Sequence, residues 1–427
     1  MQDEFSATKP GPGAPNNPLA WHEAVGYTGA MDKGAHLLCP VRIGRMTVAR
    51  NLFLAPMHEH THLALRLLCR RQGAALAWTE MVTPEDLLAP PSAEELRLHP
   101  ESARPGALWR KAENILRTTP EDRPLGVQLL PLEPGPTADA VAMLAARGTA
   151  DLVDLNFACP SERVVASGRG GGMLRNPKTA AHIVAAAVAA GGKTQVEPSR
   201  GGSPNPPRER LGDGREDPAR AAGTETRRAE LRCGTGRMPV TLKMRLGFSQ
   251  TAAAREQALG LAREAAGIGI AGLALHARAV DQGYGGRADW AAIAEWTEAL
   301  APLPVFGSGD LRFPEAVLAM LRETGCAGAS IARGALGAPW IFRQTIDLAA
   351  RGSYEPATLR ERRETVLAHF AGLAEQYGER AAVKFMHRFA TYYAKGFVGA
   401  AAARAAFQSV RTPEAFREAV EKWFAGD

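Results

Sequence analysis

The fold class can be read from residues 239–276, PVTLKMRLGFSQTAAAREQALGLAREAAGIGIAGLALH. Two short apolar runs, Pro239–Met244 and Ala271–His276, flank an Ala-rich stretch of helical character. Continuous apolar runs separated by a helix are typical of parallel strands that are buried on both faces of a sheet. This segment therefore predicts a βαβ unit.

The same alternation extends over residues 38–350 and predicts a sheet of eight strands. Eight units in about 300 residues favour a (β/α)8 TIM barrel over an open doubly wound sheet. The open sheet would need GxGxxG after its first strand, where this chain has Pro56-Met57-His58-Glu59. The remaining predicted strands are Asn51–Ala55, Ala75–Met81, Leu125–Leu130, Asp151–Asn156, Leu303–Phe306 and Gly328–Ala332.

Three regions differ from the barrel in composition. Residues 1–37 are rich in Pro and Gly, and we expect a flexible N-terminal extension. Residues 191–237 are rich in Gly, Pro, Arg and Glu and have almost no periodic apolar positions, which predicts a disordered insertion. Residues 351–427 show helical patterning without a strand signal. We expect them to form a small helical domain.

Composition narrows the class of protein. With 45% hydrophobic and 22% charged residues, the chain can bury a core, and global disorder is excluded. The net charge of +6 permits an anionic partner without requiring one. No apolar run reaches the roughly 18 residues of a membrane span. The five cysteines form no CxxC and no zinc spacing, so we expect a cytoplasmic protein without a metal. A monomer is the default expectation for the oligomeric state.

Polar residues follow nearly every predicted strand, at the end of a barrel where active sites lie. The last two loops contain Gly307-Ser308-Gly309-Asp310 and Arg333-Gly334. Glycine-rich loops and helix N-termini bring backbone amides close to an anion, which predicts a phosphate site. Glycines that serve only tight turns are the alternative. The other polar residues at these strand ends are Glu80, Gln128, Asn156, Lys243, Arg245, His276 and Arg278.

Two of these positions suggest chemistry. Lys243 lies within an apolar strand, where an amine is costly unless it meets an anion or an electron-rich ring, although it can also extend to water. Cys159 precedes a glycine-rich loop, which favours a reacting group beneath a mobile segment. A cysteine thiol with the ordinary pKa of about 8.5 is protonated at neutral pH and can donate a proton. A cysteine acting only as a small apolar residue is the alternative.

His58, His60 and His62 look at first like metal ligands. They run from Pro56 towards a helix, where this spacing spreads them over different faces, and no fourth ligand is in sight. We therefore predict no metal site.

Over roughly residues 40–190 and 238–427, the chain resembles the tRNA-dihydrouridine synthase family. The motifs that carry the resemblance, in order, are Leu54-Ala55-Pro56-Met57, Thr79-Glu80-Met81, Val127-Gln128-Leu129, Asp154-Leu155-Asn156 with Cys159-Pro160, Leu242-Lys243-Met244-Arg245-Leu246-Gly247, Leu275-His276-Ala277-Arg278, Gln282-Gly283-Tyr284, Asp289-Trp290, Gly309-Asp310, Arg333-Gly334-Ala335-Leu336-Gly337 and Pro339-Trp340-Ile341-Phe342.

The resemblance implies a flavoprotein barrel with a helical domain that grips tRNA. FMN, reduced by NADPH, would reduce a specific uridine to 5,6-dihydrouridine, and Cys159 would protonate C5 of the uracil. The residues implied to hold FMN are Pro56, Met57, His58, Gln128, Lys243, His276, Ser308, Gly309, Asp310, Ala332 and Arg333. Those implied to bind substrate are Asn156, Arg245 and Arg278 in the barrel and Lys384, Arg388 and Lys395 in the helical domain.

The chain also departs from the family pattern. His58-Glu59-His60-Thr61-His62 stands where Ala-Gly-Val-Thr-Asp is usual, Ser308 where Asn is usual and Ala332 where Gly is usual. These departures concern the position of the substrate and the affinity for flavin.

Two rival functions are an FMN barrel acting on a free small molecule, of dihydroorotate or enoate type, and an RNA-binding protein with an inactive barrel. Between Arg380 and Arg411 there are six Lys or Arg and no Asp or Glu, interleaved with aromatic residues. This stretch favours tRNA over a small molecule, although a solvated helix face is possible. The presence of Cys159, Lys243 and His276 disfavours an inactive barrel.

Overall fold

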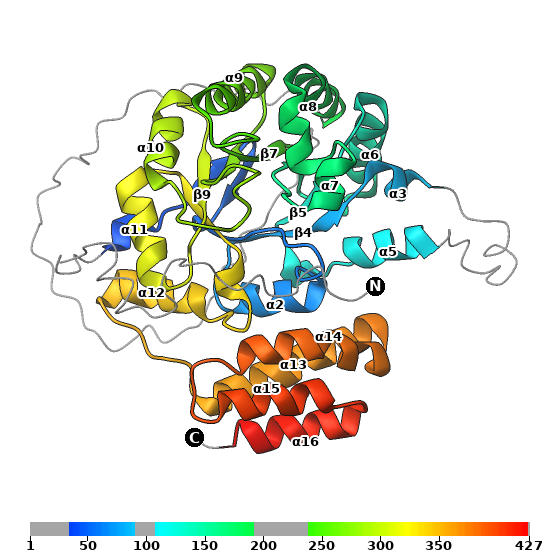
Figure 1. Ribbon diagram of the computed structural model, residues 1–427, viewed down its shortest axis with the longest axis vertical. Coiled ribbons are helices and arrows are strands. Elements are labelled where there is room, and N and C mark those ends of the chain that lie inside the picture. The colour runs from blue at the N-terminus through cyan, green and yellow to red at the C-terminus, as the bar shows by residue number, and fades with distance from the viewer. Residues whose placement is uncertain (1–33, 90–106, 192–237, 426–427) are drawn as a thin grey trace, which may run out of the picture.

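The computed structural model describes residues 34–89, 107–191 and 238–425. Eight parallel strands form a closed barrel in the order β10-β3-β4-β5-β6-β7-β8-β9, which confirms the predicted TIM barrel (Figure 1). Every strand predicted from the apolar runs is present. Their bounds are β3 Leu52–Leu54, β4 Leu76–Val82, β5 Leu125–Leu129, β6 Leu152–Phe157, β7 Val240–Arg245, β8 Leu273–His276, β9 Val305–Ser308 and β10 Gly328–Ile331.

Helices follow the strands and cover the barrel from outside. All residues of β5, β6 and β7 are buried, because the helices cover one face and the barrel interior covers the other. The helices are α2 Leu63–Arg71, α3 Pro84–Leu88, α5 Ala107–Leu116, α6 Pro134–Arg147, α7 Glu162–Ala166, α8 Pro177–Gly191, α9 Ala252–Ile268, α10 Trp290–Ala299, α11 Pro314–Thr324 and α12 Ile341–Arg351. Short 3₁₀ helices are η1 Gly34–Leu37, η3 Pro120–Asp122, η4 Gly170–Arg175 and η5 Arg333–Ala335.

An antiparallel hairpin of β1 Val41–Ile43 and β2 Met46–Val48 precedes the barrel and was not predicted. Its apolar side chains belong to one cluster with Phe53, Trp78 and Phe306 of the barrel. Other members of that cluster lie at or near the first residues of their strands, so the hairpin closes the amino-terminal end of the barrel. Strands of three residues are too short to give an alternating pattern.

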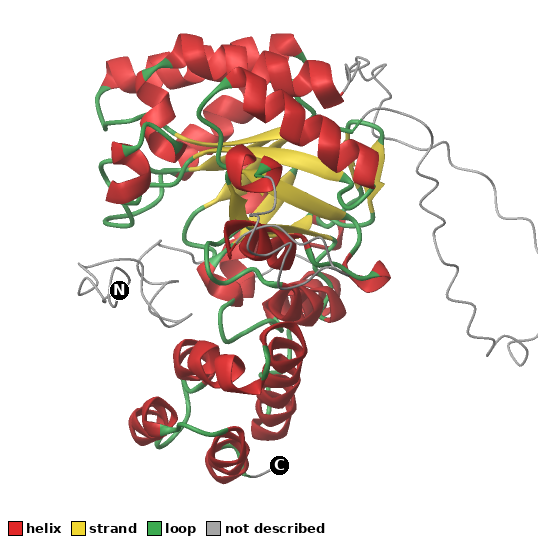
Figure 2. Cartoon of the chain, turned by 90° about the vertical axis from the view of Figure 1, so that its right-hand side faces the viewer, coloured by secondary structure: helices red, strands yellow, loops and turns green. Residues whose placement is uncertain are grey.

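The C-terminal part of the chain contains α13 Leu359–Tyr377, α14 Glu379–Tyr393, α15 Ala400–Ser409 and α16 Pro413–Trp423, which we call the helical layer. Figures 1 and 2 both show these helices as a group beside the barrel. Stacked aromatic pairs such as Phe370–Phe416 and Phe407–Phe424 fill its core. Of the aromatic residues in the predicted stretch Arg380–Arg411, Phe389, Tyr393 and Phe407 are buried and therefore have a packing role.

The helical layer meets the barrel at the loops that follow the first and last strands. Arg388 of α14 forms an ion pair with Glu59, and His369 of α13 contacts His62. Tyr392 at the end of α14 packs against Gly337. Because Glu59, His62 and Gly337 all follow carboxyl ends of strands, the layer lies beside the end of the barrel where active sites form.

Two predictions on organisation fall wholly or mostly outside the described residues. Of the predicted extension 1–37, the structure describes only Gly34–Leu37, which forms η1. Of the predicted insertion 191–237, it describes only Gly191, the last residue of α8. The domain boundary at 350/351 falls at the end of α12 and stays a prediction. Within the described residues, no helix is long and apolar enough to cross a membrane.

Candidate active site at the barrel mouth

A chain of hydrogen bonds joins β5, β6 and β7 inside the barrel, from Thr241 near the start of β7 to Asn156 near the carboxyl end of β6. The Thr241 hydroxyl donates to Asp154 Oδ1 at 2.7 Å, and Gln128 Nε2 donates to Asp154 Oδ2 at 2.7 Å. Asn156 Nδ2 in turn donates to Gln128 Oε1 at 2.9 Å. Burial raises the pKa of Asp154 to about 6. Gln128 and Asn156 were predicted site residues, whereas the roles of Asp154 and Thr241 were missed.

This network ends at Cys159. Asn156 Oδ1 accepts hydrogen bonds from the backbone N–H groups of Ala158 and Cys159, at 2.9 and 3.0 Å, and so fixes the turn that carries the thiol. The Cys159 carbonyl accepts from Gly171 N at 2.9 Å. A Cβ on Gly170, whose φ is +55°, would lie 2.9 Å from Cys159 Cβ, so the glycine-rich loop packs directly on the cysteine.

The Cys159 thiol is half-buried and has a raised pKa. Burial is the main cause, and the charges of Arg245 and Lys243 partly oppose it. The thiol therefore stays protonated at neutral pH, as proton donation requires.

Lys243 stands beside Asn156 in the register of β6 and β7. Its amine forms no hydrogen bond within the described part of the chain, although the side chain is buried. Burial lowers its pKa to about 8, against the opposing attraction of Asp154, so at neutral pH the amine is mostly charged. A buried cation without an acceptor is costly, which is the expected arrangement when a ligand supplies the acceptor.

His276 pairs in register with Ser308, next to the glycine that follows β9. A Cβ on Gly309 would lie 3.3 Å from His276 Cδ2 and 2.7 Å from Ala288 Cβ, so only glycine fits without a shift. Burial lowers the pKa of His276 well below its usual value, and nearby Arg245 and Lys243 add to this effect. The imidazole is therefore neutral and can both donate and accept a hydrogen bond.

Cationic side chains gather after β8 and β10. Arg278 Nη2 donates to both carboxylate oxygens of Asp310 at 2.8 Å, while its Nη1 is buried without a partner in the described structure. The Arg333 guanidinium lies 4.5 Å from the ring centroid of Tyr284 and forms no hydrogen bond to a described residue. Since Asp310 neutralises Arg278, the charge of Arg333 and the free Nη1 donor remain for an anion.

The Arg245 side chain, expected to bind substrate, donates hydrogen bonds to backbone carbonyls of the protein. Its Nε donates to Ala158 O at 2.8 Å, and its Nη1 donates to Ala279 O and Gly283 O at 2.9 and 2.7 Å. The side chain thereby ties the loop after β6 to the loop after β8. A direct contact of Arg245 or Arg278 with substrate stays a prediction.

Tyr284 is an exposed residue that the sequence reasoning did not select as a site residue. The residue is 49% exposed, and two guanidinium groups lie near its ring centroid, that of Arg245 at 5.3 Å and that of Arg333 at 4.5 Å. The motif Gln282-Gly283-Tyr284 was the available signal. An exposed aromatic ring among cations is a suitable surface for a nucleobase.

The three predicted cationic residues of the helical layer differ in their surroundings. Lys384 and Lys395 are exposed, and the Lys395 amine lies 4.8 Å from the ring centroid of Tyr392. Arg388 instead pairs with Glu59 of the barrel at 3.0 Å. The positive stretch is thus divided between an exposed face and a contact between the two layers.

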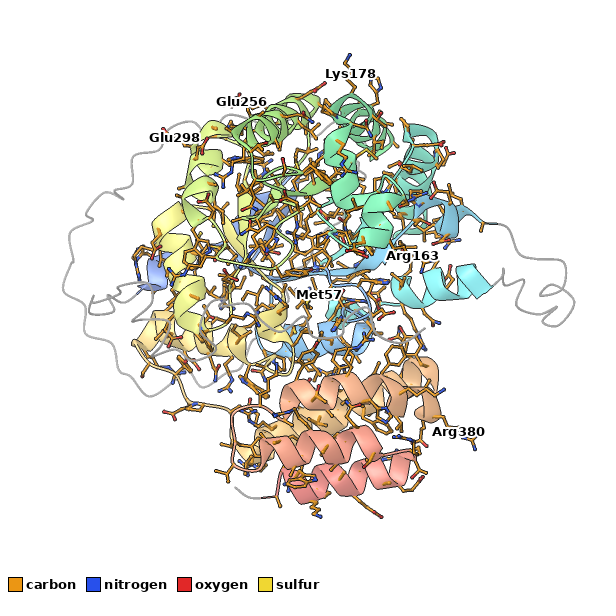
Figure 3. All side chains as sticks on the ribbon, viewed as in Figure 1. Met57, Arg163, Lys178, Glu256, Glu298 and Arg380 are labelled. Carbon is orange, nitrogen blue, oxygen red and sulfur yellow. The ribbon has the colours of Figure 1, made fainter. Side chains whose placement is uncertain are left out.

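The loop after β3 carries Pro56, Met57 and His58, all half-buried. Figure 3 shows Met57 near the centre of the molecule. His60 Nδ1 contacts the carbonyl of His58 at 2.7 Å, and His62 caps α2 by accepting from Leu65 N. No group of three or more His, Cys, Asp and Glu in the described residues could hold a metal ion.

Comparison with known proteins bears on this site. The family model described as dihydrouridine synthase (Dus) matches residues 53–197 and 229–425. The chain therefore belongs to the dihydrouridine synthase family.

Relatives match over most of both chains. A probable tRNA-dihydrouridine synthase of Mycobacterium tuberculosis is 30% identical over 381 residues, 87% of this chain and 82% of the relative. A tRNA-dihydrouridine synthase B of Xanthomonas campestris is 30% identical over 88% of this chain and 93% of the relative. The corresponding values for a probable tRNA-dihydrouridine synthase of Treponema pallidum are 29%, 84% and 88%.

A solved structure, the old yellow enzyme homologue from Zymomonas mobilis, is similar with a TM-score of 0.44 and 13% identity, over 76% of this chain and 95% of that chain. This similarity is too low to bear on function.

Proposed function

We propose that the protein reduces a specific uridine of tRNA to 5,6-dihydrouridine, with FMN as cofactor and NADPH as reductant. Membership of the dihydrouridine synthase family supports the reaction class. The observation that carries the proposal is the placement of Cys159 at the barrel mouth, where Asn156 Oδ1 accepts from its backbone N–H and burial raises the pKa of its thiol.

The described residues fit a flavin phosphate and ring. The orphaned Nη1 of Arg278 and the Arg333 guanidinium would bind the phosphate, and the missing Cβ of Gly309 lets the loop after β9 pack closely against His276. Lys243 and Gln128 would face the ring system from β7 and β5. When bound, reduced FMN supplies the hydride for C6 of the uracil.

Cys159 would donate its Sγ proton to C5 of the uracil as C6 is reduced. The thiolate left behind is stabilised by the charges of Arg245 and Lys243, which oppose part of the rise that burial causes in the pKa of Cys159. Water then returns a proton to the thiolate. General acid catalysis of this kind contributes roughly 10²–10⁴-fold to a rate.

The test uses the purified full-length protein with an unmodified tRNA transcript and NADPH. We expect flavin absorbance in the protein and a gain of two hydrogens at one uridine, read by mass spectrometry of the digested tRNA. Cys159→Ala should keep the flavin and lose roughly 10²–10⁴-fold in single-turnover dihydrouridine formation. The exposed Cys39 provides the matched control, Cys39→Ala.

Two results would contradict the proposal. Wild-type rates in Cys159→Ala would exclude the thiol as the proton donor. A yellow protein that oxidises NADPH with a small acceptor but leaves every transcript unmodified would favour the small-molecule oxidoreductase instead.

A further inference from the structure

Arg312 is a cation that the cofactor site does not use. It lies in the loop between β9 and α11, where its backbone N–H donates to Asp310 O at 2.9 Å. The neighbouring Leu311 carbonyl packs on Gly334, since a Cβ there would approach it to 2.1 Å. The Arg312 side chain is half-buried and forms no hydrogen bond to any described residue. The N–H groups of the Arg312 guanidinium, which lies beside the loop after β10, are therefore available to bind a ligand.

The end of α14 meets this same region from the helical layer. A Cβ on Gly337 would lie 2.3 Å from the carbonyl carbon of Tyr392, so the two backbones are in direct contact. The Lys395 amine lies over the Tyr392 ring, and the Lys395 carbonyl accepts from Arg362 Nη1 at 3.0 Å. We call this meeting of the β9 and β10 loops with residues 392–395 the seam.

Among the described residues, the charged side chains that act on Arg312 and Lys395 are mostly cations. Burial, followed by the charge of Arg333, lowers the pKa of Arg312 to about 10. Partial burial, followed by the charge of Arg312, lowers the pKa of the exposed Lys395. Asp310 is the acidic group that acts on Arg312, and its carboxylate is already bound by Arg278 and Ala288 N. Two mutually repelling cations without a free carboxylate fit an anionic ligand.

We propose that Arg312 and Lys395, with Tyr392 beneath the Lys395 amine, form a subsite for a backbone phosphodiester of the tRNA. This inference rests on the proposed function. The two cations come from different layers, so one phosphate between them would link the barrel mouth to the face of α14 that carries exposed Lys384. The Tyr392 ring adds an aromatic surface next to the phosphate, as single-stranded nucleic acid sites commonly have.

The experiment measures binding of the full-length protein to an unmodified tRNA transcript across a series of NaCl concentrations. The variants are Arg312→Gln, Lys395→Gln and the double variant. Each lost phosphate contact should lower the slope of log K against log salt by about 0.7–0.9. Lys178→Gln is the matched control, because this exposed lysine on α8 lies at the far side of the barrel from the helical layer (Figure 3).

Each outcome has a distinct meaning. A weaker affinity and a reduced slope in both single variants, with the control unchanged, supports the subsite. Wild-type slope in the double variant overturns it. Loss of bound flavin with unchanged tRNA affinity would assign Arg312 to the cofactor phosphate, and a raised NADPH KM with unchanged tRNA affinity would assign it to the reductant. If the wild-type protein binds no tRNA, it is the proposed function that fails.

Discussion

Acid should weaken the structure at one buried contact between the barrel and the helical layer. His62 Nδ1 accepts from Leu65 N, so its Nε2 carries the proton and donates to His369 Nε2 at 3.3 Å. His369 Nδ1 then donates to the Tyr393 hydroxyl at 3.1 Å. This direction of bonding requires both imidazoles to be neutral. Protonation of either ring would replace one of these hydrogen bonds by a repulsion between two N–H groups.

The magnitude follows from the pKa of His369. Burial is the main cause that lowers it from 6.5 to about 3, and His62 is lowered in the same direction by burial and by the charges of His369 and Arg66. As the pH is lowered, the unfolded chain binds the proton on His369 before the folded protein does. The stability that depends on neutral His369 is therefore complete above pH 6.5 and is lost as the pH falls towards 3. Between pH 7 and pH 5, His369 alone accounts for a loss of about 2 kcal/mol.

The assay is urea unfolding of the full-length protein at pH 7 and pH 5. His369→Phe and His369→Gln remove the titrating group, so the difference in unfolding free energy between the two pH values should shrink by about 2 kcal/mol in each. His182, exposed on α8, gives the control variant His182→Gln, which should keep the wild-type difference. An equal pH dependence in wild type and both His369 variants would refute the reasoning.

The remaining predictions concern the cofactor phosphate and the packing of the two layers. Arg333→Ala should lose flavin on gel filtration, since a charged hydrogen bond is worth about 1.5–3 kcal/mol; Arg351→Ala, exposed on α12, should retain it. Gly337→Ala should lower the thermal midpoint, because φ is +70° and the new Cβ would meet the Tyr392 backbone. Gly352→Ala has a similar φ of +79° but open space around it, so it measures the backbone strain alone. Equal losses in the two glycine variants would show that the contact with Tyr392 gives way freely.

Much of the site could be predicted from local sequence because its residues follow strands. Asn156, Lys243 and His276 are polar residues at the ends of apolar runs, and a parallel barrel brings all such ends to one mouth. Cys159 follows one of the same runs and is fixed in place by Asn156. These relations depend only on chain neighbours and on the register of adjacent strands.

The sequence by itself determined the barrel, because strands buried on both faces must be continuously apolar and that property is visible in the letters. The tertiary structure alone decided which polar groups are already satisfied. Arg245 donates its hydrogen bonds to backbone carbonyls of two loops. Arg388 pairs with Glu59, which is 329 residues away in the sequence. His62 meets His369 over 307 positions. Such partners come together only when distant segments pack, so no local pattern could distinguish a residue held by the protein from one left for a ligand.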